Sequence, residues 1–252
     1  MLRLRTRRNS ALTEMNVTKD RFFSIISHDL KNPAVAQREA LQLLLDNAHL
    51  WDSGMLKRYS RELVSTADRQ VELLYGLLNW AQVQTGRMTF TPASFDLAAH
   101  LRNETALIGK MAEQKGVVLT VTLPETAVVT GDSNMLATVV RNLLTNAVKF
   151  TPAGGTVTLT VEPLCSGGAC PAATGYTVAV SDTGTGMTPE QIQNLFRIDR
   201  QPSREGTAGE KGSGLGLIVC RELLEKHGSK LHIESGEGKG SMFRFELRQE
   251  KL

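Results

Sequence analysis

Three polar side chains that could take part in chemistry lie in a predicted helix over residues 133–150. At about 100° per residue, Asn142, Asn146 and Lys149 fall on one side of that helix, opposite its apolar face. An amide oxygen suits Mg²⁺, and a lysine ammonium suits phosphate oxygens. Because asparagine is unfavourable inside a helix, two on one face indicate a function. The stripe predicts contacts with a metal ion and with phosphate; the alternative is a merely solvated face.

Two glycine-rich runs follow, at places where a backbone could approach a ligand closely. The first comes directly after an apolar strand, and the second opens a helix, whose start offers unpaired amides to phosphates. Their residues are Asp182, Gly184 and Gly186 in the first run, and Gly212, Gly214, Leu215 and Gly216 in the second. The carboxylate of Asp182 is placed to accept a hydrogen bond from an exocyclic amine such as that of adenine. The residues between the runs are rich in Gly, Arg, Glu and Lys and suit a mobile lid.

Together these residues resemble the sequence boxes of the GHKL (Bergerat) ATPase fold. The matching segments are Asn142-x-x-x-Asn146, Asp182-x-Gly184-x-Gly186, Leu195-Phe196 and Gly212-x-Gly214-x-Gly216, with Gly238-x-Gly240-Ser241 as a weaker final box. The resemblance implies that ATP is bound with Mg²⁺. It places Mg²⁺ on Asn146, adenine on Asp182, and the triphosphate near Asn142 and Lys149, under the lid and the second glycine box.

A histidine lies in a long helical pattern near the start of the chain. The run Ser27–Pro33 reads S-H-D-L-K-N-P, and on a helical wheel His28 projects roughly opposite the apolar side. Pro33 has no N–H and would leave the carbonyl of Asp29 unpaired, which bends or loosens the helix beside the histidine. An exposed histidine on a helix predicts no function by itself.

Placed before the ATPase pattern, however, this run resembles the histidine box of the sensor histidine kinases of two-component systems. The resemblance extends over nearly the whole chain and implies that His28 is the residue that becomes phosphorylated. It makes Asp29 the acid that orients the imidazole or takes its proton, although Glu is the commoner family residue there and reaches further. It assigns Asn32 to dephosphorylation of a partner. That partner is the receiver domain of a response regulator, which receives the phosphoryl group on an aspartate.

The elements that carry His28 must be helical. From Ser10 to Gly86, apolar residues recur at steps of three and four, with a single proline. We expect a first helix to about Leu50, a short turn over residues 51–54 and a second helix after it. Apolar residues of the second helix approximate a heptad seam at Leu56, Leu63, Val64, Ala67, Val71, Leu74, Leu78 and Ala81. Because two such helices cannot bury their stripes alone, we expect a homodimer with a four-helix bundle.

After Gly86 the pattern changes to helices that alternate with strands rich in valine and threonine. Asp96 is expected to cap a helix that ends at Gly116. Further predicted elements are the strands 117–123, 128–130, 156–161, 176–180, 230–234 and 241–247, and the helices 133–150 and 215–227. The segment between the third and fourth of these strands is expected to be a loop insert. The fold class is therefore α+β, a helical hairpin followed by an α/β sandwich, which the resemblance specifies as the GHKL type.

These patterns predict three parts of the chain. We expect a linker or signalling helix over residues 1–15, a dimerisation and phosphotransfer domain over 16–88, and a catalytic ATP-binding domain over 89–252. The other four histidines lack metal-ligand spacing and are assigned structural roles; they are His49, His100, His227 and His232. His227, which precedes Gly228, is interpreted as a cation at the C-terminal end of a helix.

Composition limits the partners and the compartment. The 252 residues are 41% hydrophobic and 22% charged, which is typical of a globular chain. The net charge is only +3, with four arginines among the first eight residues, so nothing indicates nucleic-acid binding. Three cysteines favour a reducing, cytoplasmic setting. No apolar run is long enough for a membrane span, but the basic start resembles the cytoplasmic side of one. We expect the cytoplasmic portion of a membrane-bound sensor, with membrane contact only through segments missing from this chain.

Two other functions share parts of this pattern. One is a catalytically silent nucleotide-binding dimer that docks a regulator as a scaffold. The other is an ATPase clamp of the mismatch-repair or chaperone type, which gives no reason for the histidine helix. The presence of His28, Asn146 and Asp182 together favours the kinase.

Overall fold

The computed structural model describes residues 31–47, 51–84, 88–164, 174–196, 205–210 and 214–249. His28, Asp29 and Gly212 lie outside the described residues, as do Cys165 and Cys170. The chain divides into two compact units, and the boundary between them falls at residues 77 and 78, within helix α2. None of the described helices is both long and apolar enough to cross a bilayer.

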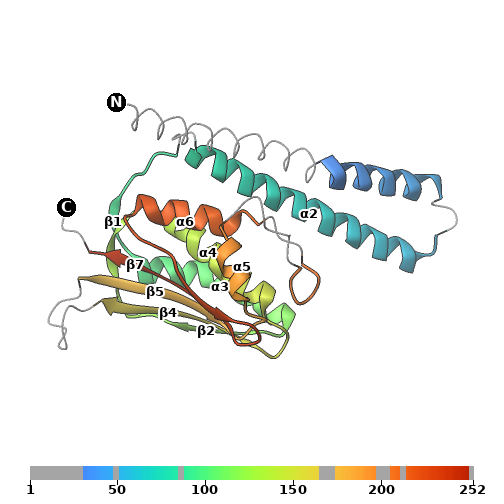
Figure 1. Cartoon of the computed structure of the whole chain (residues 1–252). Coiled ribbons are helices and arrows are strands. Elements are labelled where there is room, and N and C mark those ends of the chain that lie inside the picture. The colour runs from blue at the N-terminus through green and yellow to red at the C-terminus, as the bar shows by residue number, and fades with distance from the viewer. Residues whose placement is uncertain are drawn as a thin grey trace. The chain divides into compact units, whose positions relative to one another are not determined.

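The first unit is a helical hairpin (Figure 1). Residues 31–46 are helical, and α2 spans Ser53–Gln84. Across the hairpin, the side-chain amide of Gln37 donates to the carbonyl of Leu63 at 3.3 Å. Asp52 caps α2, because its carboxylate accepts a hydrogen bond from the N–H of Met55 at 2.7 Å. Of the expected turn over residues 51–54, Ser53 and Gly54 already belong to α2.

The second unit is built on a five-stranded mixed sheet with strand order β2-β4-β5-β7-β6. The strands are β2 (Val118–Thr122), β4 (Thr156–Leu164), β5 (Gly175–Asp182), β6 (His232–Gly236) and β7 (Gly240–Arg248). Only the β2–β4 pairing in this sheet is parallel. A second, two-stranded sheet pairs β1 (Ala93–Asp96) with β3 (Val128–Gly131).

Helices cover one face of the five-stranded sheet (Figure 1). They are α3 (Leu97–Lys115), α4 (Ser133–Phe150) and α6 (Gly216–Lys226), and a short helix α5 (Pro189–Asn194) follows β5. The strands alternate between buried and less buried residues, so Val157, Leu159 and Val161 of β4 all lie in the core. The apolar face predicted for α4 is fully or almost fully buried at Leu136, Val139, Leu143, Leu144 and Ala147. The layer of helices and the sheet thus form the core that positions the site.

Helix α3 shows how closely local signals fixed some boundaries. The side chain of Asp96 accepts from the N–H of Ala98 at 3.0 Å, and Gly116 ends the helix in the left-handed region at φ 71°. Both caps are the predicted ones. The α+β class is likewise confirmed for the described residues.

Other boundaries depend on strand pairing, and their prediction from the sequence was wrong. Strand β4 continues past Val161 to Leu164, because Leu164 pairs with Gly175 at the start of β5. The insert is therefore shorter than expected. Strand β1 was not predicted, because four residues with little alternation become a strand only through their pairing with β3.

Candidate nucleotide-binding site

Asp182 ends β5, and the residue is almost entirely buried, at 7% exposure. Its Oδ1 accepts hydrogen bonds from the backbone N–H of Gly184 at 2.8 Å and of Ser241 at 3.2 Å. No described residue donates to Oδ2, so this atom is the acceptor that remains for a ligand. Burial raises the pKa of Asp182 above its ordinary value, although the two amides oppose the shift. The site thus presents a fixed carboxylate with one defined acceptor position.

The glycines of the first run are required by close backbone packing. A side chain on Gly184 would collide with the carbonyl of Phe150, the last residue of α4. Gly186 has φ 62°, and a side chain there would meet the carbonyl of Gly236. Both positions were predicted for close approach to a ligand. In the structure they also join the loop after Asp182 to its neighbours.

The final glycine box supports the first one. Gly238 donates from its N–H to the carbonyl of Thr185, a residue of the first run, at 2.8 Å. Gly240 has φ 80°, and a side chain there would meet the carbonyl of Asp182. Gly238 and Gly240 therefore shape the β6–β7 hairpin, and the same hairpin holds the Asp182 loop and supplies the Ser241 amide.

The three polar residues of the predicted stripe do lie on one helix, α4. Asn142 donates from Nδ2 to the carbonyl of Thr138 at 3.0 Å. A side chain on Gly216 would lie 3.0 Å from Oδ1 of Asn142, so the stripe meets the start of α6. The ammonium of Lys149 lies 5.0 Å from the ring centroid of Phe150. This arrangement brings the asparagine box and the second glycine box together.

Asn146 fits the role of a metal ligand. It is half-buried, and its side chain makes no hydrogen bond to a described residue. Its amide oxygen is therefore available, and such oxygens are suitable donors for Mg²⁺ when phosphates supply the other ligands.

The second glycine run opens α6. Gly214 is exposed with φ 70°, Leu215 is buried, and Gly216 begins the helix. The N-cap residue Leu215 makes no side-chain hydrogen bond, and no side chain among the described residues caps this helix. No described side chain accepts from the first amides of α6, and a phosphate is a suitable acceptor for such amides.

The phenylalanine element is tied to α6. The guanidinium of Arg221 lies 4.8 Å from the ring centroid of Phe196. Before it, Thr188 and Gln191 form a capping box at the start of α5. This contact supports Phe196 as an anchor for one end of the lid.

Three residues that hold the two ends of α4 were not predicted from the sequence. Asp132 caps α4, accepting from the N–H groups of Asn134 and Met135 at 3.1 Å, and an Asp before a helical pattern could have revealed it. Lys115 and Glu210 form an ion pair between residues 95 positions apart. No local pattern connects those two.

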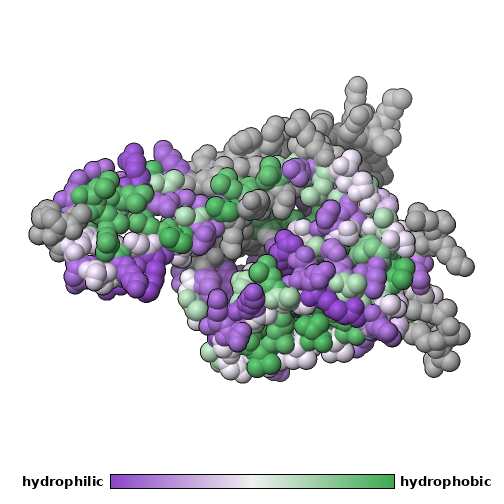
Figure 2. Space-filling model, turned by 180° about the vertical axis from the view of Figure 1, so that it is seen from behind, coloured by the Kyte–Doolittle hydropathy of each residue, from purple (hydrophilic) through white to green (hydrophobic). Residues whose placement is uncertain are grey.

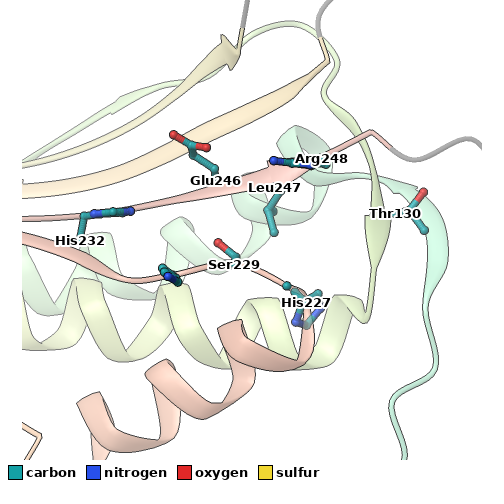
Figure 3. Close-up of a pocket in the computed structure, with 9 residues that line it drawn as sticks. Thr130, His227, Ser229, His232, Glu246, Leu247 and Arg248 are labelled. Atoms are coloured by element: carbon teal, nitrogen blue, oxygen red, sulfur yellow. The ribbon is translucent and has the colours of Figure 1, made fainter.

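A pocket of about 390 Å³ lies elsewhere in the second unit, lined by His227, Ser229, His232 and Arg248 among others (Figure 3). In the β5–β7 pair, Arg248 is opposite Gly175, whereas Asp182 is opposite Ser241. The pocket therefore lies toward the opposite end of these strands from Asp182, and no predicted nucleotide residue lines it.

The histidine run is described only from Lys31 onward. Asn32 is exposed, and Pro33 lies within the helical residues 31–46. The predicted effect of Pro33 on the helix at His28 lies outside the described residues.

Comparison with known proteins finds a matching family and several relatives. Residues 131–251 match the family described as Histidine kinase-, DNA gyrase B-, and HSP90-like ATPase. The Adaptive-response sensory kinase SasA of Thermosynechococcus vestitus is 30% identical over 246 residues, which are 94% of this chain and 61% of SasA. The Non-motile and phage-resistance protein of Caulobacter vibrioides is 27% identical over 92% of this chain and 27% of its own length. The chain thus spans less than two thirds of either relative.

Solved structures share the fold. The histidine kinase AdeS of Acinetobacter baumannii has a TM-score of 0.67 at 19% identity and covers 89% of this chain and 98% of its own. Full-length ShkA in complex with AMPPNP has a TM-score of 0.62 at 23% identity, over 88% of this chain and 47% of ShkA. The histidine kinase ThkA in complex with the response regulator protein TrrA has a TM-score of 0.68 at 21% identity, over 98% and 64%.

Over residues 131–251, the chain is similar to the histidine kinase-, DNA gyrase B- and HSP90-like ATPases. Within that class, the chain is a relative of the sensor histidine kinases of two-component signalling.

Proposed function

We propose that this chain is the core of a protein histidine kinase, which uses Mg-ATP to phosphorylate His28 and passes the phosphoryl group to an aspartate of a response regulator. One observation carries the proposal. Asp182 has one carboxylate oxygen fixed by two backbone amides and the other left for a ligand, in the same unit as the Asn142, Asn146 and Lys149 stripe. The kinase names of the relatives and the AMPPNP complex of ShkA support ATP as the nucleotide.

Adenine binding follows from the acceptor geometry. The exocyclic amine of adenine donates to Oδ2 of Asp182, while Gly184 and Ser241 keep Oδ1 in place. Because the carboxylate is buried, this hydrogen bond forms away from competing water and gains strength. Guanine has a carbonyl oxygen at the corresponding position, so this oxygen and Oδ2 would be two hydrogen-bond acceptors facing each other.

The triphosphate would lie along α4, near its polar stripe. The ammonium of Lys149, the amide of Asn142 and the first amides of α6 provide positive or hydrogen-bonding contacts for phosphate oxygens. Asn146 would hold Mg²⁺, and the ion when bound supplies positive charge against the phosphate oxygens. Alignment and charge neutralisation are the main requirements of phosphoryl transfer.

Transfer requires a nitrogen nucleophile. A neutral imidazole nitrogen of His28 attacks the γ-phosphorus, so a P–N bond forms while the bond to the β–γ bridging oxygen breaks and ADP leaves with that electron pair. Asp29 orients the ring and takes the proton from its other nitrogen. The phosphoryl group then moves to a regulator aspartate. Asn32, which is exposed on the helix, is the residue proposed to act in dephosphorylation of that regulator. The ThkA–TrrA complex supports a response regulator as the partner.

Helix α2 supports a homodimer as the working form. Figure 2 shows apolar side chains gathered on the surface of the helical hairpin. On α2, Leu56, Val64, Val71 and Leu74 are 47%, 60%, 48% and 51% exposed in the single chain. Positions 64 and 71 are one heptad apart, so a second copy of the hairpin would cover this stripe. We propose that two copies form a four-helix bundle in the cytoplasm.

The deciding experiment is incubation with Mg²⁺ and ATP labelled on the γ-phosphate. We expect protein-bound label that acid removes and alkali does not, and we expect none with His28→Gln or Asn146→Ala. Equal label on His28→Gln would reject the acceptor assignment. ATP hydrolysis without any phosphoprotein would favour the clamp, and nucleotide binding without either reaction would favour the scaffold.

Mixed dimers test the direction of transfer. If one protomer phosphorylates its partner, His28→Gln combined with Asn146→Ala regains label, because each variant supplies what the other lacks. Transfer within one protomer leaves the mixture unlabelled.

A further inference from the structure

Lys115, the last residue of α3, makes three polar contacts in the second unit. Its ammonium lies 2.6 Å from Oε1 of Glu210 and donates to the carbonyls of Val148 at 3.0 Å and Lys149 at 2.6 Å. The side chain of Lys115 is only 13% exposed, and that of Glu210 is 37% exposed. All three ammonium donors are thus matched to acceptors, two of them carbonyls at the C-terminal end of α4.

Glu210 closes a compact turn over residues 206–210, here termed the lid turn. Its Oε2 accepts from the N–H of Ala208 at 2.8 Å, and its carbonyl accepts from the N–H of Gly206 at 2.6 Å. The lid turn belongs to the segment between the two glycine runs, just before the second run. Its shape therefore depends on the same carboxylate that pairs with Lys115.

The lid turn also rests directly on the end of α4. Thr207 donates from its N–H to the carbonyl of Lys149 at 3.1 Å and from its hydroxyl to the carbonyl of Thr151 at 2.9 Å. A side chain on Gly206 would overlap the Cγ position of Lys149 at 2.6 Å. The backbone of Lys149 is thus held by both Lys115 and the lid turn, while its side chain belongs to the phosphate-facing stripe.

We propose that the Lys115–Glu210 pair is a clasp that fixes the lid turn on the nucleotide-binding helix and thereby strengthens binding of the triphosphate. The inference rests on the proposed function of the site as an ATP site. Both residues are positioning residues, since they act through the lid turn and Lys149. A lid whose last turn is already ordered loses less conformational freedom when it covers the phosphates, so less of the binding energy is spent on ordering.

The test uses Lys115→Met, Glu210→Gln and the double variant in the full chain. Hydrogen exchange of the lid turn should speed up in each variant. The affinity for an ATP analogue labelled on the ribose should fall about three- to tenfold in each single variant. The double variant should be no weaker than Lys115→Met alone, because the ion pair is already lost in that variant. Affinity for adenosine should stay unchanged, since it has no phosphates for the lid to cover. Lys115→Arg keeps the charge and donors and should restore most of the ATP affinity.

A matched control is available between the same two helices. Arg141 of α4 pairs with Glu104 of α3, with Nε to Oε2 at 3.0 Å, and neither residue contacts the lid turn. Glu104→Gln should leave lid exchange and ATP affinity unchanged. Unchanged ATP affinity in Glu210→Gln, or an equal loss for adenosine, would overturn the clasp. Wild-type protein that binds neither ligand would overturn the proposed function, and lid exchange would then still show whether the pair holds the turn.

Discussion

The backbone N–H of Asp132 donates to Nε2 of His227 at 3.0 Å, and Nδ1 of the same ring lies 2.7 Å from the carbonyl of Leu223. With Nε2 as an acceptor, Nδ1 carries the proton and the ring is neutral. The expectation that His227 acts as a cation at the end of α6 is therefore wrong. The ring instead joins the end of α6 to the residue that caps α4.

Loss of this ring should destabilise the second unit. His227→Ala leaves the N–H of Asp132, a residue only 6% exposed, without its acceptor, and also removes an edge contact with Phe90 at 4.9 Å between centroids. We expect the free energy of unfolding to fall by about 1–3 kcal/mol, measured by urea denaturation. His232→Ala, at an exposed histidine of β6, is the control and should change little. Equal stability of the two variants would contradict the role of the hydrogen bond.

Asp182→Asn should weaken adenine recognition without unfolding the domain. The amides of Gly184 and Ser241 require an acceptor, so the new amide oxygen takes the Oδ1 place and the NH₂ takes the Oδ2 place. There it faces the adenine amine as a second donor. We expect adenosine affinity to fall at least about tenfold by calorimetry. Asp96→Asn is the matched control, because Asp96 also accepts from two backbone amides, those of Ala98 and Ala127, outside the predicted site.

Adenosine binding should weaken on acidification at a higher pH than an ordinary aspartate would give. Burial raises the pKa of Asp182 above 3.8, so in the folded protein its carboxylate takes up a proton earlier as the pH falls. A protonated Oδ2 is a donor and cannot accept from the amine. Because the pKa of Asp182 is raised in the folded state, its ionisation lowers the free energy of unfolding as the pH rises. Protonation of Asp182 in acid therefore does not unfold the protein.

Adenosine is the ligand for this titration because it has no phosphate that titrates in the same range. The affinity of the wild type should fall with pH, whereas the weak affinity of Asp182→Asn should stay flat. Parallel profiles for the two proteins would show that another group is responsible.

Gly186→Ala should disturb the loop that holds Asp182. The residue has φ 62°, and a methyl group would meet the carbonyl of Gly236 in the neighbouring hairpin. Gly154→Ala provides the comparison, since Gly154 has φ 85° but open space around it. The left-handed backbone alone costs about 1–2 kcal/mol, so thermal unfolding should show a loss of that size for Gly154→Ala and a larger one for Gly186→Ala. Adenosine affinity should fall only in the latter.

Val64→Glu should separate the dimer. Val64 is 60% exposed on α2 in the single chain, and a carboxylate there would be buried against the second copy. Ser65→Glu adds the same charge at the next, also exposed position, which does not belong to the apolar stripe. Sedimentation should show a monomer for Val64→Glu and a dimer for the wild type and Ser65→Glu. A dimer in all three would argue against the α2 stripe as the interface.

Local signals predicted much of this structure. The bounds of α4, the caps of α3 at Asp96 and Gly116, and the shared face of Asn142 and Asn146 follow from helix periodicity and capping within a few residues of chain. The close backbone approach at the glycine runs was also predicted from neighbouring residues, since glycines directly after a strand favour a turn.

Contacts between distant segments could not be predicted in this way. Strand β1 exists because of β3, and the extent of β4 depends on β5. The pairing of Lys115 with Glu210 and of His227 with Asp132 joins residues 95 positions apart in each case. Periodicity carries no information at that separation.

By itself, the sequence determined which chemical groups are present and which of them share a helix face or a turn, because these depend on neighbouring residues alone. The tertiary structure decided that Oδ2, and not Oδ1, of Asp182 is left for a ligand, and that the end of α4 is shared between Lys115 and the lid turn. Hydrogen-bond acceptors are assigned by the donors that the folded chain brings to them. Gly184 is a neighbour of Asp182, but Ser241 of β7 is far from Asp182 in the sequence, and Lys115 and Thr207 are far from the end of α4.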